Sequence, residues 1–141
     1  MGSLRIITMI TKSIFVGLLI SIFSVSSYNI RVDFEIKGQA KSKKYGYDKK
    51  FPIKVGGGTT AGYHFQFIEH LRGPNGEKLE VSRIGSCGNY PNPDPTLTPF
   101  KEGVLTCFSI NHPGLKKPLT LYFDKYRSND LYIPVGLTWA E

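Results

Sequence analysis

The chain has 141 residues, of which 40% are hydrophobic and 21% charged, and its formal net charge is +7. This length and composition argue for one globular domain and against several. Fifteen glycines and nine prolines favour turns and short elements over long helices, and eight tyrosines and nine phenylalanines favour strands.

The first 27 residues have the pattern of a signal peptide. Arg5 and Lys12 are basic, Ile14–Phe23 is an apolar run, and small serines follow it. The run is shorter than the roughly 20 residues of a transmembrane helix, with an uncleaved anchor as the alternative. No cysteine lies near the cleavage zone to carry a lipid. We therefore expect a periplasmic or secreted protein whose residues 28–141 form a single small globular domain, of net charge +5, with no transmembrane span.

Cys87 and Cys107 are the two cysteines of the chain. An exported chain folds in an oxidising compartment, where paired cysteines persist. We expect them to form one structural disulfide, which would stabilise the fold by about 3 kcal/mol through the entropy of the unfolded chain.

Asn29–Lys37 alternates between apolar and charged residues, which predicts a strand with one face exposed to water. The apolar face would hold Ile30, Val32, Phe34 and Ile36.

The segment Gly38–Lys50 is basic and carries two tyrosines, and its lysines continue to Lys54. One interpretation is a surface that binds an anionic glycan, a lipid surface or a protein partner. The simpler alternative is a solvated linker, and an exported protein is not expected to bind nucleic acid. The candidate binding residues are Lys43, Lys44, Tyr45, Tyr47, Lys49 and Lys50.

Phe51–Val55 predicts a short strand, ended by three glycines. Thr59–Leu71 is ambiguous, because its aromatic residues alternate as in a strand while its apolar residues also form a helical stripe. We favour a helix, because Gly73 and Pro74 follow in the order expected after one.

Gly73–Glu77 has the composition of a tight turn. Strands are predicted after it at Lys78–Ile84, Val104–Ile110 and Pro118–Tyr126, and a last, irregular strand at Leu131–Trp139.

Gly88–Pro99 contains four prolines, so we expect a loop here rather than a regular strand. A disulfide between Cys87 and Cys107 would clamp the base of this loop and order it. Rigidly mounted loops often bind partners, which makes Tyr90, with Asn89, Asn92 and Asp94 near it, a further candidate binding surface. The alternative is that these residues simply form turns.

The sequence shows no catalytic or cofactor motif, so we expect no cofactor. His64 and His70 are six residues apart, which does not match the spacing of a helical metal site, and no metal site is expected. An alternative function is a small envelope hydrolase in which His64, His70 or His112 acts with a nearby carboxylate.

Several motifs occur in one order: Tyr45–Tyr47, Pro52–Gly58, Leu71–Glu77 and Arg83–Cys87. Together they resemble an uncharacterised family of short exported bacterial proteins, over about Tyr45 to the C-terminus. That family often carries the label 2-dehydro-3-deoxyphosphooctonate aldolase. The aldolase is a TIM barrel, which needs about 250 residues, so the resemblance does not imply aldolase activity here. Relatives often have a second cysteine at the position of Gly88, so their cysteine pairing does not carry over.

We thus predict an α+β fold: a small antiparallel, mostly meander sheet with one packed helix and one disulfide. The expected function is a monomeric, non-enzymatic binding protein of the cell envelope. Neutralisation of an exported toxin is a specific variant of this function.

Overall fold

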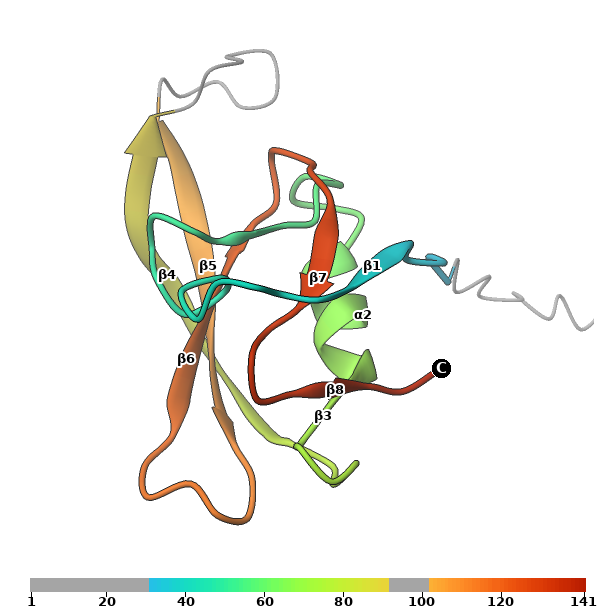
Figure 1. Cartoon of the computed structure of the whole chain (residues 1–141). Helices are drawn as coiled ribbons and strands as arrows, with labels where there is room; N and C mark the ends of the chain where they lie inside the picture. Colours follow the sequence, from blue (N-terminus) through green and yellow to red (C-terminus); the bar gives the residue numbers. More distant parts are fainter. Residues whose placement is uncertain (1–30, 92–101) are drawn as a thin grey trace, which may run out of the picture. The chain divides into compact units, whose positions relative to one another are not determined.

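The computed structural model describes residues 31–91 and 102–141. The predicted signal peptide, residues 1–27, and residues 92–99 of the predicted proline-rich loop lie outside the described residues. The elements in chain order are β1 (Ile36–Gln39), β2 (Ile53–Lys54), α2 (Tyr63–His70), β3 (Leu71–Arg72), β4 (Glu80–Pro91), β5 (Glu102–Asn111), β6 (Leu119–Asp124), β7 (Leu131–Ile133) and β8 (Thr138–Trp139) (Figure 1). The described residues are mostly sheet with one α-helix, which confirms the α+β class.

The strands form one four-stranded sheet and two short pairs. In the larger sheet the order is β2-β6-β5-β4, and β4, β5 and β6 are antiparallel neighbours. β2 joins β6 in parallel, β1 pairs with β7 in parallel, and β3 pairs with β8 antiparallel. The expected all-antiparallel sheet is therefore wrong at β1 and β2. Parallel pairs need long connections, and residue periodicity does not encode which distant segments meet.

β4 is longer than predicted. The predicted loop begins at Gly88, but β4 continues to Pro91. Its pairing with β5 shifts register between Arg83 and Gly85 and again between Ser86 and Asn89. Such bulges admit irregular residues into a strand, and Gly85 and Gly88, at φ 107° and 130°, adopt backbone angles that favour glycine.

The predicted disulfide is confirmed. Cys87 of β4 bonds to Cys107 of β5, with their Cα atoms 6.0 Å apart. The bond joins the two strands beside the second register shift. It therefore fixes the end of β4 that carries Asn89 and Tyr90.

The ambiguous segment Thr59–Leu71 contains the helix α2, which confirms the helical interpretation. The helix begins after Gly62, at φ 67°, and ends where Leu71 turns extended. Phe67 of α2 meets Phe123 of β6 edge-on, with ring centroids 5.8 Å apart, and Phe123 meets Phe108 of β5 at 5.5 Å. These rings belong to a buried cluster that also holds Ile53, Val55, Ile68, Leu71, Leu79, Ile110, Leu121 and Leu137.

The predicted alternation of half-buried and exposed residues at the start of the described chain is confirmed, but the strand there is shorter than predicted. Val32, Phe34 and Ile36 are half-buried and the charged residues between them are exposed. The strand itself begins only at Ile36, where pairing with β7 starts, and Asn29 and Ile30 of the predicted strand lie outside the described residues. Across residues 31–91 and 102–141, no helix has the length and apolar character needed to cross a membrane.

Candidate functional site

The basic segment Gly38–Lys50 is held against the sheet by its backbone. The amide of Gly46 donates to the carbonyl of Phe51 at 2.8 Å, and the amide of Tyr122 on β6 donates to the carbonyl of Gly46 at 2.8 Å. Gly46 is buried at φ 80°, and an added Cβ would lie 3.1 Å from Ile53. The segment is therefore fixed in place, and its last two lysines lie at one edge of a surface hollow.

The hollow has a volume of about 410 Å³ and a strongly basic lining. Among the described residues that line it, four are cationic, namely Lys49, Lys50, Lys54 and Arg127, and none is acidic. The remaining lining residues are Pro52, Asn89, Tyr90, Pro91 and Leu105. The cations come from the basic segment, from β2 and from the turn after β6, so the fold gathers charges that the sequence separates.

The three lysines keep their charges available. None of them forms an ion pair with any residue in the described part of the chain. One lining residue, Asn89, donates a hydrogen bond to Oε2 of Glu102 at 3.1 Å. A cleft lined by one sign of charge raises the local concentration of counter-ions.

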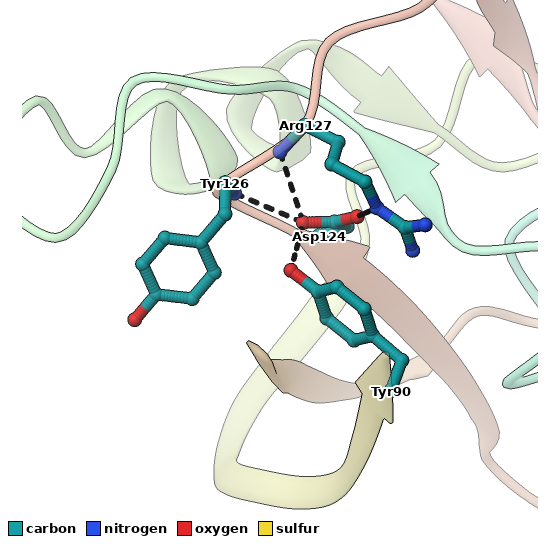
Figure 2. Close-up of polar contacts among 4 residues, drawn as sticks. All are labelled: Tyr90, Asp124, Tyr126 and Arg127. Atoms are coloured by element: carbon teal, nitrogen blue, oxygen red, sulfur yellow. Dashed lines mark hydrogen bonds and ion pairs between the residues drawn. The ribbon is translucent and has the colours of Figure 1, made fainter. Parts of the chain in front are cut away.

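Asp124 holds the fourth cation, Arg127, in position (Figure 2). Its carboxylate is fully buried, and Oδ1 accepts hydrogen bonds from the amides of Tyr126, at 2.9 Å, and Arg127, at 3.1 Å. Oδ1 also accepts a hydrogen bond from the hydroxyl of Tyr90, and Oδ2 forms an ion pair with Nε of Arg127. Four donors therefore compensate this buried charge, which would otherwise be costly.

Arg127 is consequently held in one orientation. Its guanidinium carbon lies 4.2 Å from the ring centroid of Tyr90, a cation–π contact. Nε is engaged with Asp124, while the two Nη atoms point away from that carboxylate and hydrogen-bond to no described residue (Figure 2). The planar guanidinium thus offers two donors to the hollow, and this geometry suits a carboxylate or phosphate.

Burial also affects Tyr90 itself. Its side chain is 8% exposed. This burial, with the hydrogen bond to Asp124 and the charge of that residue, raises the pKa of the Tyr90 hydroxyl. The hydroxyl therefore remains a neutral donor to Asp124, and Tyr90 contributes its ring face to the site through Arg127.

The structure brings together only some of the sequence-predicted residues. Lys49, Lys50 and Tyr90 line the hollow, whereas Lys43 and Lys44 are exposed outside its lining. Lys44 lies over the ring of Phe51, 5.8 Å from its centroid.

Tyr45 and Tyr47 are also outside the hollow and have structural contacts. The hydroxyl of Tyr45 accepts from the amide of Tyr132 at 3.1 Å, and the hydroxyl of Tyr47 donates to the carbonyl of Val135 at 2.8 Å. Burial raises the pKa of each to about 12. These two side chains attach the basic segment to the C-terminal part of the chain.

Sequence reasoning did not identify Asp124 and Arg127 as site residues. Asp124 lies near the end of a predicted strand, and Arg127 lies in the polar turn that follows it. The signal that could have found them is a carboxylate closing an apolar strand with an arginine three residues later. Lys54 belongs to the predicted lysine run but not to the predicted site.

The three histidines do not meet a carboxylate among the described residues. Nδ1 of His70 donates to the carbonyl of Ala140 at 2.7 Å, and Nδ1 of His112 donates to that of Pro113 at 2.8 Å. His64 is 2% exposed, and its Nδ1 has no hydrogen-bond partner within the described chain. The hydrogen-bonded acid that the hydrolase alternative requires is therefore not in place at any of them.

The described residues contain no group of three or more His, Cys, Asp or Glu side chains placed to hold a metal ion. Comparison of the chain with family models, with curated proteins and with solved structures gives no match. The resemblance to a family of short exported proteins stays a prediction.

Proposed function

We propose that this chain is an exported cell-envelope protein that binds anionic groups in the basic hollow without catalysing a reaction on them. One observation carries the proposal: four cationic side chains from three segments line a hollow of about 410 Å³, and no acidic residue lines it in the part of the chain that the structure describes. In this proposal α2 covers one face of the β4–β5–β6 meander, and the hollow lies where β2, β4 and the turn after β6 meet.

The ligand chemistry follows from the cations. Arg127 presents two donors in a fixed plane, which favours bidentate contact with phosphate or carboxylate. Lys49, Lys50 and Lys54 add mobile point charges around it. The volume falls within the range of small-molecule sites, so one or two anionic groups of a glycan or a lipid head group would fit.

The envelope location rests on two features. The disulfide between Cys87 and Cys107 suits an oxidising compartment. The predicted signal peptide at residues 1–27 would deliver the chain there. The chain would act as a monomer, since one molecule supplies all four cations.

The test is a binding series with three probes: pyrophosphate, alginate oligosaccharides and phosphatidylglycerol vesicles. Affinities are measured by calorimetry or co-sedimentation at 50 and 500 mM NaCl. We expect binding to at least one probe, weakened about tenfold or more at the higher salt concentration.

Three double variants change the net charge equally. Lys49→Glu/Lys50→Glu alters the hollow, Lys43→Glu/Lys44→Glu alters the same segment outside it, and Lys116→Glu/Lys117→Glu alters the exposed turn after β5. We expect only the first to lose binding. Equal losses in all three would mean that net charge, and not the hollow, attracts the anion. Absence of binding to every probe would refute the proposal.

A further inference from the structure

The outer edge of β4 has no partner strand in the part of the chain that the structure describes. β4 is the last strand of the order β2-β6-β5-β4, and within residues 31–91 and 102–141 no strand pairs with its other side. Glu80, Val81, Ser82 and Arg83 are all exposed and pair in regular register with β5. A regular strand edge of this kind presents unpaired amides and carbonyls that can receive another strand.

An apolar groove runs beside this edge, between α2 and β4. It has a volume of about 670 Å³, and its lining includes Phe65 of α2, Val81 of β4 and Phe108 of β5. Phe65 is 42% exposed and Val81 is 41% exposed, although both are large and apolar. A strand added to β4 would place alternate side chains over this groove.

The side chains that line the groove are mostly basic where they are charged, and this favours an acidic partner. Of the described residues that line it, Arg72, Lys78 and Arg83 are basic and one, Glu69, is acidic. The guanidinium of Arg83 lies over the ring of Phe65, 5.6 Å from its centroid, so apolar and cationic contacts are adjacent. A segment that alternates acidic and apolar side chains would match both.

A second copy of the chain matches less well. Two β4 edges would bring the same basic groove lining together, and like charges oppose that association. The register shifts after Arg83 also twist the edge, a feature that limits self-pairing of strands.

We propose that β4 from Glu80 to Arg83 is the docking edge for an extended, acidic and apolar segment of a partner protein, which adds as a strand and buries an apolar side chain in the groove. This surface is separate from the basic hollow and does not depend on the proposed function.

The test uses a displayed library of nine-residue peptides in which Asp or Glu alternates with Val, Ile, Leu or Phe. A matched library carries Lys or Arg in place of the acids. We expect the acidic library to be enriched on the purified protein and the basic library not to be. Enriched peptides should lose binding when alternate amides are N-methylated, because strand addition needs those hydrogen bonds.

Variants on exposed positions locate the binding. Val81→Glu and Arg83→Glu should each weaken the binding of an enriched peptide at least tenfold. The controls Ile84→Glu, on the same strand outside the groove lining, and Lys116→Glu should change it less than threefold. Circular dichroism and thermal melting verify that each variant is folded.

Four results would overturn the proposal. Three are no enrichment of the acidic library, binding of enriched peptides to Val81→Glu and Arg83→Glu as tightly as to the unmodified protein, and strand-edge dimerisation of the free protein in sedimentation. Loss of peptide binding in Lys49→Glu/Lys50→Glu but not in Arg83→Glu would also overturn it, while supporting anion binding in the hollow.

Discussion

Tyr90 of β4 donates its hydroxyl hydrogen bond to the buried carboxylate of Asp124, at the end of β6. The two residues are separated by 34 positions, and β5 lies between their strands. This contact joins the outer strand of the sheet to the turn that carries Arg127. The hydrogen bond therefore links two segments that line the basic hollow.

Replacing Asp124 with Asn should be strongly destabilising. The change removes a buried charge that compensates Arg127, and breaking a buried pair costs about 3–5 kcal/mol. Tyr90→Phe removes one hydrogen bond to the same carboxylate and should cost about 1–3 kcal/mol. Because the ring under Arg127 remains, Tyr90→Phe should keep anion affinity within about threefold. Urea unfolding and calorimetry measure the two effects, and equal stability losses would contradict this description of Asp124.

Gly103 of β5 should not tolerate a side chain. It pairs with Tyr90 across the strands, and an added Cβ would lie 2.5 Å from the Tyr90 hydroxyl oxygen. Gly103→Ala should therefore displace the ring and cost about 1–3 kcal/mol. The control is Gly73→Ala, where the added Cβ would meet the carboxylate of Glu77, the far end of a flexible side chain. If the two substitutions lower the urea midpoint equally, the Tyr90 ring does not occupy this position.

Tyr45→Phe and Tyr47→Phe should leave anion binding unchanged and lower stability by about 1 kcal/mol each, because each loses one backbone hydrogen bond. The tyrosine pKa values of about 12 also predict an alkaline transition. Unfolded tyrosines lose their protons near pH 10, so the free energy of unfolding should fall as the pH rises from 10 to 12. Absorbance of tyrosinate, followed with circular dichroism, measures both. If either variant lost anion affinity, the replaced tyrosine would have to be counted among the binding residues.

His64 should titrate far below an ordinary histidine. Burial, with the charges of Lys125 and Arg83, lowers its pKa from 6.5 to about 4. The unfolded chain therefore binds the proton first as the pH falls, and the free energy of unfolding should decrease between pH 6.5 and 4.

NMR titration of the histidine ring protons measures this directly. The His64 resonance should move with a midpoint near 4, and His64→Gln should remove part of the acid-induced loss of stability. A midpoint of 6 or above would show that the ring is not buried as the structure has it.

The sequence predicts local features of the fold better than it predicts which strands pair with each other. The alternation of Val32 to Ile36, the helix that contains Phe67, and the disulfide all follow from composition and spacing. The parallel pairs of β2 with β6 and of β1 with β7 join segments far apart in the chain, which no local period encodes. Prolines after Gly88 predicted a loop, but two bulges let β4 continue to Pro91.

The sequence predicts three residues of the site, Lys49, Lys50 and Tyr90. Lys49 and Lys50 are recognisable because they belong to a lysine-rich segment. Tyr90 is recognisable because it is an aromatic residue beside a loop that the disulfide would clamp. The sequence places Tyr45 and Tyr47 in the same basic segment, which suggests that they are exposed. In the structure their hydroxyls hydrogen-bond to backbone groups of the C-terminal part of the chain. The role of Asp124 depends on three donors from a turn and one from another strand, an arrangement that exists only after folding.

The most direct test of the central claim is to map an anion on the protein by NMR. Pyrophosphate is titrated into ¹⁵N-labelled protein at low salt, and amide shifts are followed residue by residue. The proposal predicts saturable shifts at Lys49, Lys50, Lys54, Asn89 and Arg127, which disappear in Lys49→Glu/Lys50→Glu. Shifts that spread over all exposed lysines, including Lys43, Lys44, Lys116 and Lys117, or no saturable shift at the hollow, would contradict it.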